Sequence, residues 1–297
     1  MLAVPMNSSA SEITVYATYE SPVVTAPVQY QEYICGQDIV LNWTKPTGTI
    51  SHYIVSVRHL YYADETINEL IVDKAIVTAP TRTYTIKKKD LYPNSSYRAS
   101  VCAVYSNASA TKKYSEDMYF FTTMHTTKAT HPISMKIWTG FETATKDAIY
   151  YSARTWNNNI DVNNTEIINT YPYSQGQSTN KINYTDGVHS VTGVAQGTTG
   201  FVGWTHIRWD TSNATYNPVE IDINLNKTYP FANSAQAGKY DVQSVMTHEM
   251  GHAFGLTDKY DAFAAGWTMY GDSILNSIAQ RSLHKQDITN INQIYIP

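Results

Sequence analysis

One stretch, His-Glu-Met-Gly-His-Ala-Phe-Gly-Leu-Thr-Asp at residues 248–258, constrains this chain more than any other. On a helix, His248 and His252 lie one turn apart on the same face, so both imidazoles can bind one metal ion. Glu249 is adjacent, where its carboxylate can polarise a water molecule at that metal. The alternative is a chance occurrence of the pattern on an ordinary amphipathic helix, with these polar side chains facing solvent.

Two further residues extend the pattern beyond the helix. Glycine accepts the left-handed backbone conformation that ends helices, so the chain can turn back at Gly255. That turn would bring Asp258 to the same metal as a third ligand. Three protein ligands with one open position are typical of a catalytic zinc site, whereas four are typical of a structural one. Asp261 is the alternative third ligand, and either aspartate could instead bond local backbone amides.

The extended pattern, His-Glu-x-x-His-x-x-Gly-x-x followed by a third ligand, resembles the signature of the metzincin metallopeptidases. Most metzincins have histidine in the last position, and Asp258 resembles the snapalysin-type variant. Residues 267–271, Trp-Thr-Met-Tyr-Gly, resemble the Met-turn of these enzymes. The segments 240–245 and 281–295 resemble the flanks of the zinc helix and the closing helix in the matrixin branch.

This resemblance implies a zinc-dependent endopeptidase. Its single catalytic Zn²⁺ would be bound by His248, His252 and Asp258, and Glu249 would be the general base in peptide hydrolysis. Met269 would pack beneath the metal without binding it. Aspartate in place of the usual histidine adds a negative charge to the ligand set, which should make zinc a weaker Lewis acid.

The resemblance also implies protein or peptide substrates. We expect a substrate to bind as an extended strand along an edge strand, which we place within residues 190–204. We expect residues after 258, including 263–267, to form a wall of the side-chain pocket. A structural Ca²⁺ or Zn²⁺ site is a further implication, with His189 and His206 as candidate ligands. We favour ordinary surface or core histidines at these two positions.

The first half of the chain shows short alternating strands separated by turn residues, a pattern typical of a β-sandwich. Ile39, Leu41 and Trp43 alternate onto one face of a predicted strand. A Leu-Tyr-Pro corner at residues 91–93 precedes a long alternating strand at 97–104. These features resemble a fibronectin type III domain, and another immunoglobulin-like sandwich is the alternative. Such modules commonly dock or display, so we also expect a docking partner for the sandwich.

We therefore predict two domains, which a chain of 297 residues is long enough to form. The expected fold class is an all-β immunoglobulin-like (fibronectin type III) sandwich followed by an α+β metzincin catalytic domain. The predicted boundaries are an N-terminal extension at 1–20, the sandwich at 21–124, a polar linker at 125–133 and the peptidase domain at 134–297.

Periodicity predicts the main elements of the peptidase domain. We expect strands at 134–138, 205–210 and 219–225, and a zinc helix at about 241–254. An earlier helix should end near residues 157–159, because three consecutive asparagines favour a turn.

Composition limits the setting and the partners. A net charge of -4 without a basic stripe argues against nucleic acid as a partner. No apolar run approaches the roughly 20 residues that span a bilayer. Abundant Asn, Thr and Ser with only 15% charged residues favour a secreted protein, extracellular or at a cell surface. Cys35 and Cys102 allow one disulfide, and two free thiols are an equal alternative.

Two classes of function follow from these features. The first is a secreted zinc metalloendopeptidase with an accessory sandwich. The second is a surface adhesion or binding protein whose metzincin domain holds metal but is weakly active or acts on few substrates. The presence of Glu249 favours the first class, because a decayed site has no reason to keep a general base. Cleavage of a generic unfolded protein would separate the two classes.

Overall fold

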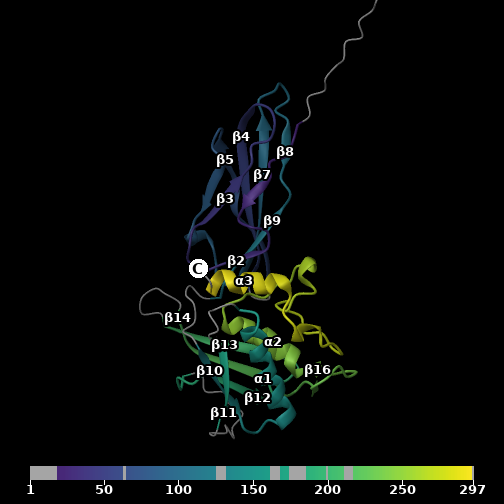
Figure 1. The fold of residues 1–297 in the computed structure, drawn as a ribbon. Helices are drawn as coiled ribbons and strands as arrows, with labels where there is room; N and C mark the ends of the chain where they lie inside the picture. Colours follow the sequence, from purple (N-terminus) through teal and green to yellow (C-terminus); the bar gives the residue numbers. More distant parts are fainter. Residues whose placement is uncertain are drawn as a thin grey trace, which may run out of the picture.

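The computed structural model describes residues 19–62, 65–124, 132–160, 168–173, 185–198, 200–210 and 217–295. These residues form an N-terminal β-sandwich and a C-terminal α/β domain, as predicted (Figure 1). Figure 1 shows the two domains end to end, with the C-terminal helix α3 (Lys285–Tyr295) at their junction. Most of the predicted N-terminal extension and linker lies outside the described residues. No helix in the described ranges is long and apolar enough to cross a membrane.

The sandwich has two sheets. The smaller has the strand order β1 (Val24–Ala26), β3 (Ile39–Trp43), β6 (Thr83–Ile86). The larger has the order β2 (Gln31–Tyr33), β9 (Met118–Thr122), β7 (Ser95–Tyr105), β4 (Ile50–Tyr62), β5 (Glu65–Thr78), and β8 (Lys112–Tyr114) also pairs with β7. Strand β2 joins its sheet in parallel at the edge nearest the second domain, which places it against α3.

The core of the sandwich follows the predicted alternation. Ile39, Leu41 and Trp43 are all buried on one face of β3. At the predicted corner, the Tyr97 hydroxyl accepts a hydrogen bond from the Tyr92 backbone N–H at 2.6 Å. The corner is therefore tied to the long strand β7, whose inward residues fill the centre of the sandwich.

Two features of the sandwich are decided only by the structure. Cys35 and Cys102 are both free and buried, so the disulfide alternative is wrong. Strand β5 is not predicted by the periodicity. Its ladder with β4 contains register shifts, and Asn68 and Lys74 have φ of 56° and 54°. Such bulges break the alternation from which strands are predicted.

The second domain is built on a five-stranded sheet with the order β11 (Ile168–Tyr173), β10 (Ile133–Trp138), β12 (Ser190–Val194), β14 (Asn217–Asn226), β13 (Gly203–Asp210). The first four strands are parallel, and β13 runs antiparallel to β14. The predicted strands at 134–138, 205–210 and 219–225 are thus confirmed. Among the described strands, β11 and β13 are the two outer strands of this sheet and β12 lies inside it, so only the end of the predicted range 190–204 belongs to an edge strand.

Two helices pack together and cover the sheet with an apolar core. Helix α1 (Thr143–Asn157) ends at the asparagine run as predicted, and α2 (Val242–Ala253) contains both histidines of the motif. The Trp156 indole of α1 is fully buried and donates to the Thr247 carbonyl of α2 at 2.8 Å. This hydrogen bond fixes the position of α2 along its axis relative to α1.

The start of α2 is fixed by a cap and an ion pair. The Asp241 carboxylate accepts from the Ser244 backbone N–H at 2.8 Å, which satisfies a free donor of the first turn. Arg281 donates to both carboxylate oxygens of Asp241, at 2.8 and 2.6 Å. The two flanking segments singled out in the sequence therefore meet at this pair.

Candidate active site

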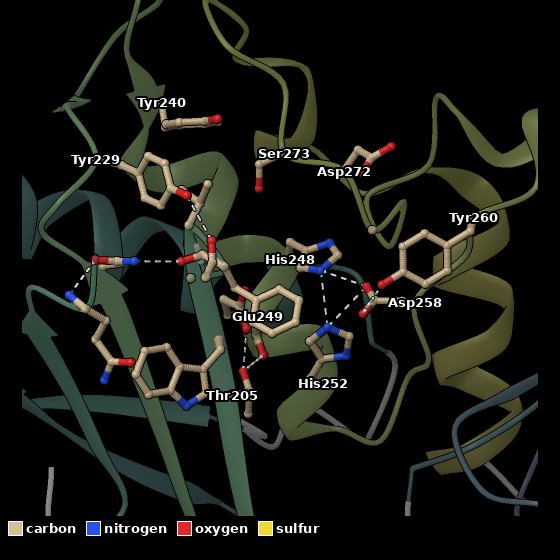
Figure 2. A pocket seen from close by; sticks show the side chains of 18 of the residues that line it. Thr205, Tyr229, Tyr240, His248, Glu249, His252, Asp258, Tyr260, Asp272 and Ser273 are labelled. Carbon is tan, nitrogen blue, oxygen red and sulfur yellow. Dashed lines mark hydrogen bonds and ion pairs between the residues drawn. The ribbon is translucent and has the colours of Figure 1, made fainter. Parts of the chain in front are cut away.

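Helix α2 presents His248 and His252 side by side, and both are buried. The helix then ends in a Schellman turn, with Gly255 N–H bonded to the His252 carbonyl and Leu256 N–H bonded to the Gly251 carbonyl. Gly255 has a φ of 95°, which a residue with a side chain rarely adopts. The predicted reversal of the chain at this glycine is confirmed, and it brings Asp258 back to the helix (Figure 2).

Three donor atoms meet at one point. The Nε2 atoms of His248 and His252 are 3.1 Å apart, and Asp258 Oδ1 lies 3.0 and 3.3 Å from them. A tetrahedral zinc with ligands at about 2.0 Å requires donor atoms about 3.3 Å apart. The triangle therefore has the size of one face of a zinc tetrahedron. Asp261, the alternative ligand, instead accepts a hydrogen bond from Ser96 of the sandwich at 3.3 Å.

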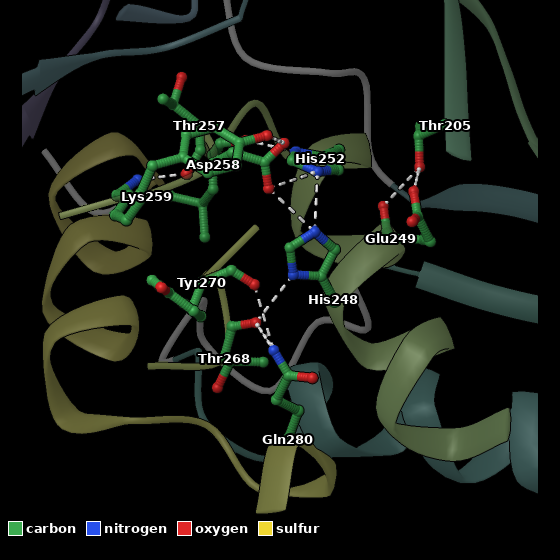
Figure 3. A network of polar contacts seen from close by, with 12 residues as sticks. Thr205, His248, Glu249, His252, Thr257, Asp258, Lys259, Thr268, Tyr270 and Gln280 are labelled. Carbon is green, nitrogen blue, oxygen red and sulfur yellow. Dashed lines mark hydrogen bonds and ion pairs between the residues drawn. The ribbon is translucent and has the colours of Figure 1, made fainter. Parts of the chain in front are cut away.

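Backbone carbonyls orient the two imidazoles. His248 Nδ1 lies 2.9 Å from the Thr268 carbonyl oxygen, and His252 Nδ1 lies 2.8 Å from that of Leu256 (Figure 3). A carbonyl only accepts, so each Nδ1 carries a proton and Nε2 is the atom of each ring that is left to bind a metal. Two such nitrogens facing a carboxylate oxygen form a donor set that fits a bound cation.

The charges of these three residues also favour a bound cation. Burial alone would lower the pKa of His252, but the Asp258 carboxylate outweighs it and raises that pKa to about 9. Burial would raise the pKa of Asp258, but the two histidines hold it well below its usual range. Asp258 thus stays ionised and attracts a positive charge to the donor atoms. Among the described residues, these three form the single group with the geometry to hold a metal ion.

Glu249 lies beside the donor atoms and is held by the edge strand. Its Oε2 is 2.8 Å from the Thr205 hydroxyl, which also lies 2.8 Å from the Glu249 backbone oxygen. Gly203 makes room for the carboxylate, because a β-carbon there would lie 3.0 Å from Glu249 Oε1 and 2.7 Å from Val245. Burial raises the pKa of Glu249, against the effect of the two histidines. The sequence motif does not reveal Thr205 or Gly203, since they come from a distant strand.

The predicted Met-turn packs under the helix. Met269 is fully buried, and a β-carbon at Gly251 would overlap its side chain and touch Trp156. The glycine inside the motif therefore lets the methionine lie directly against α2. The carbonyl of Thr268, one residue earlier, is the one that orients His248.

Tyr260 is a site residue that the motif analysis does not identify. Its hydroxyl lies 3.3 Å from Asp258 Oδ2. Its ring occupies the space next to Gly271, where a β-carbon would overlap it. Tyr270, which the sequence analysis does not place at the metal, packs instead with the aromatic residues between the two domains.

A cleft of about 620 Å³ opens over these groups (Figure 2). One side is formed by the beginning of β13 and the residues before it, 200–205, and the other by Tyr260 and residues 271–273. None of the described strands pairs with the outer side of β13, so its backbone can pair with an extended peptide. The predicted wall after residue 258 is therefore formed by Tyr260 and residues 271–273, whereas residues 263–267 do not line this cleft. Phe263 and Trp267 pack against Tyr30 of the sandwich, because the segment turns away from the metal toward the other domain.

The other histidines considered from the sequence lie elsewhere. His189 Nδ1 accepts from the Ile221 backbone N–H at 3.0 Å, which gives this ring a structural contact in the sheet. His206 lies on β13. Neither belongs to a group of three potential metal ligands among the residues that the structure describes. A structural metal ion remains a prediction.

The fold and this site define a zinc metallopeptidase of the metzincin class. Residues 122–296 match the model of the family Matrixin, and residues 32–119 match Fibronectin type III domain. The chain therefore belongs to the matrixin family and has a fibronectin type III domain in front of the peptidase domain. No curated protein matches its sequence.

Two of the solved structures similar to the chain each match about a third of it. The fibronectin(III)-like modules of Clostridium thermocellum CbhA are 19% identical, with a TM-score of 0.26, and the match covers 35% of this chain and 96% of the module chain. The third fibronectin III domain of human KIAA0343 protein is 15% identical, with a TM-score of 0.24 and a coverage of 38% and 91%.

Proposed function

We propose that this protein is a secreted zinc endopeptidase in which His248, His252 and Asp258 bind the catalytic metal and Glu249 is the general base. One observation carries the proposal. The three donor atoms form a triangle of the size that zinc requires, and a buried carboxylate lies beside it at the floor of a cleft that an extended peptide can enter.

Zinc, when bound, supplies a Lewis acid that polarises the scissile carbonyl and lowers the pKa of water to about 7. Glu249 accepts the proton of the attacking water and passes it to the leaving amine. Burial raises the pKa of Glu249, which suits a base that must also act as an acid. The Thr205 hydroxyl holds the Glu249 carboxylate in place, and β13, the outer strand of the described sheet on this side, positions the substrate backbone.

The experiment is cleavage of casein by the full chain loaded with zinc, with and without a zinc chelator, compared with Glu249→Ala. We expect cleavage that the chelator stops, and a loss of about 10²- to 10⁴-fold in Glu249→Ala with zinc content unchanged. Glu116→Ala, at an exposed glutamate of the sandwich, is the matched control and should retain full activity.

Unchanged activity in Glu249→Ala would refute the role of this residue. Failure of the zinc-loaded wild type to cleave any unfolded protein would instead favour the binding or adhesion class. Secretion is supported by composition, which is rich in Asn, Thr and Ser and poor in charge. Fractionation of source cells with an antibody to the peptidase domain tests it, and a purely intracellular pool would contradict it.

A further inference from the structure

The two kinds of metal ligand are held in different ways. His248 and His252 are fixed by the backbone of α2. Asp258 follows the helix on a segment outside the helices and named strands, held on the peptidase side by the β-bridge of Lys259 with Tyr270, so its position depends on what holds the neighbouring residues. Those neighbours are Thr257 and Lys259, and both are fully or almost fully buried.

Thr257 is bonded to the sandwich domain through its backbone and its side chain. Its N–H donates to Glu32 Oε1 at 2.6 Å. Its hydroxyl lies 2.7 Å from the Thr122 carbonyl oxygen and 2.9 Å from the Asn94 side-chain oxygen. These partners come from β2, the end of β9 and the corner before β7, so three parts of the sandwich meet at this one residue.

Lys259 is bonded to the same sandwich carboxylate from the other side. Its ammonium lies 2.6 Å from Glu32 Oε2, and both side chains are 0% exposed. The ammonium also donates to the Thr257 carbonyl and lies 4.6 Å from the centre of the Phe121 ring. A lysine in such a place needs its partner, because a buried charge without a counter-charge is strongly unfavourable.

One carboxylate of the sandwich therefore bridges the residues on both sides of the third metal ligand. Figure 3 shows Thr257 and Lys259 flanking Asp258, which faces the histidines. The surrounding interface is apolar and closely packed. Phe121 of β9 packs with Ala264 and Trp267 of the peptidase domain. The sandwich is thus in firm contact with the loop that bears the ligand.

We infer that the sandwich is a fixed part of the catalytic unit, and that Glu32 positions Asp258 for metal binding. This inference rests on the proposed function. It gives the sandwich a role in building the active site, where a module of this kind would be expected to dock or display. Glu32 acts through Thr257 and Lys259 and is a positioning residue.

The test uses the full chain and measures zinc affinity by competition with a chromogenic chelator, together with kcat and KM on a peptide. For Glu32→Gln we expect zinc affinity to fall by about 10- to 100-fold, as for other residues that orient metal ligands. We expect kcat to fall while KM is unchanged, because the substrate edge β13 is not disturbed. Gln286→Ala is the matched control, since it removes an interface bond to the Tyr30 carbonyl away from the ligand loop.

A second variant covers the case in which Glu32→Gln does not fold. Glu32→Leu combined with Lys259→Met removes both buried charges and leaves an apolar pair, which proteins commonly tolerate. It still lacks the bond to the Thr257 N–H, so zinc affinity should again fall. Wild-type zinc affinity and kcat in either folded variant would overturn the inference.

Asp258→Ala in the same titration separates this inference from the proposed function. Unchanged zinc affinity in Asp258→Ala would refute the ligand set itself. A loss of affinity in Asp258→Ala, with wild-type affinity in Glu32→Gln, would refute only the positioning role of the sandwich.

Discussion

The two halves of the metal site contrast in how they are held. His248 and His252 belong to one helix, whose pitch sets their separation and whose cap and packing lie within the peptidase domain. Asp258 lies on a loop, and the residue before it is bonded to Glu32 of β2, more than two hundred residues earlier in the chain. Part of a catalytic site can therefore be encoded by local spacing while another part depends on a second domain. The two halves should respond differently to substitution.

Among variants that leave the catalytic side chains intact, the largest effect is expected from Gly203→Ala, which acts on the helix that bears His248 and His252. The new β-carbon would press on Val245 and on the Glu249 carboxylate without touching the loop of Asp258. We expect kcat to fall by about 100-fold, because small displacements of catalytic groups are costly, with zinc affinity unchanged. Gly200→Ala also lies on the cleft but meets only a distant Asn226 atom, and its kcat should match the wild type. A fully active Gly203→Ala enzyme would mean that Glu249 is not held as described.

Gly251→Ala tests how the same helix rests on the Met-turn. A β-carbon there would overlap Met269, so either the helix or the turn must move. We expect the free energy of unfolding to fall by about 1–3 kcal/mol, the usual cost of overpacking a core. Urea denaturation measures it. At Gly266 a β-carbon meets nothing within 4 Å, so Gly266→Ala is the matched control and should change stability little. Equal stabilities of the two variants would contradict the packing.

Asp287 gives the smallest effect and concerns the contact between α3 and the Met-turn. Burial raises its pKa to about 6, and its Oδ2 accepts from the Thr268 N–H at 2.8 Å. The unfolded value is about 3.9, so the folded state binds this proton more tightly. The stability that this proton contributes is present below about pH 4 and is lost as pH rises through about 6.

Asp287→Asn removes the charge and keeps an acceptor for Thr268. The full shift corresponds to about 3 kcal/mol, and the unpaired amide of asparagine cancels part of it. We therefore expect a net stabilisation of about 1 kcal/mol at pH 8 and a net destabilisation of about 1–2 kcal/mol at pH 4, where wild-type Asp287 is protonated in the folded state, measured by urea denaturation at both. Stabilisation that is equal at the two pH values would show that ionisation of Asp287 is not its source.

The same contrast explains what could be predicted from the sequence. The spacing of His248 and His252 predicts that both bind the metal from one helix, and Gly255 predicts the turn after that helix. The alternation in β3 and the corner at Tyr97 similarly identify the sandwich. These features depend on residues close together in the chain, so periodicity and turn chemistry reveal them.

What the sequence analysis missed depends on contacts between distant segments. Thr205 and Gly203 act on Glu249 only because β13 packs against α2. Residues 263–267 are part of the predicted wall of the cleft, but Phe263 and Trp267 pack against the sandwich instead. No local pattern marks Glu32 as the partner of Lys259, since burial of the pair requires both domains.

The most direct test of the account is anomalous diffraction at the zinc edge from crystals of the zinc-loaded full chain. We predict one strong peak bounded by Nε2 of His248, Nε2 of His252 and a carboxylate oxygen of Asp258, with the Glu32 carboxylate still bonded to the residues on either side of Asp258. A peak at which Asp258 is turned away, or no peak at the two histidines, would contradict the central claim.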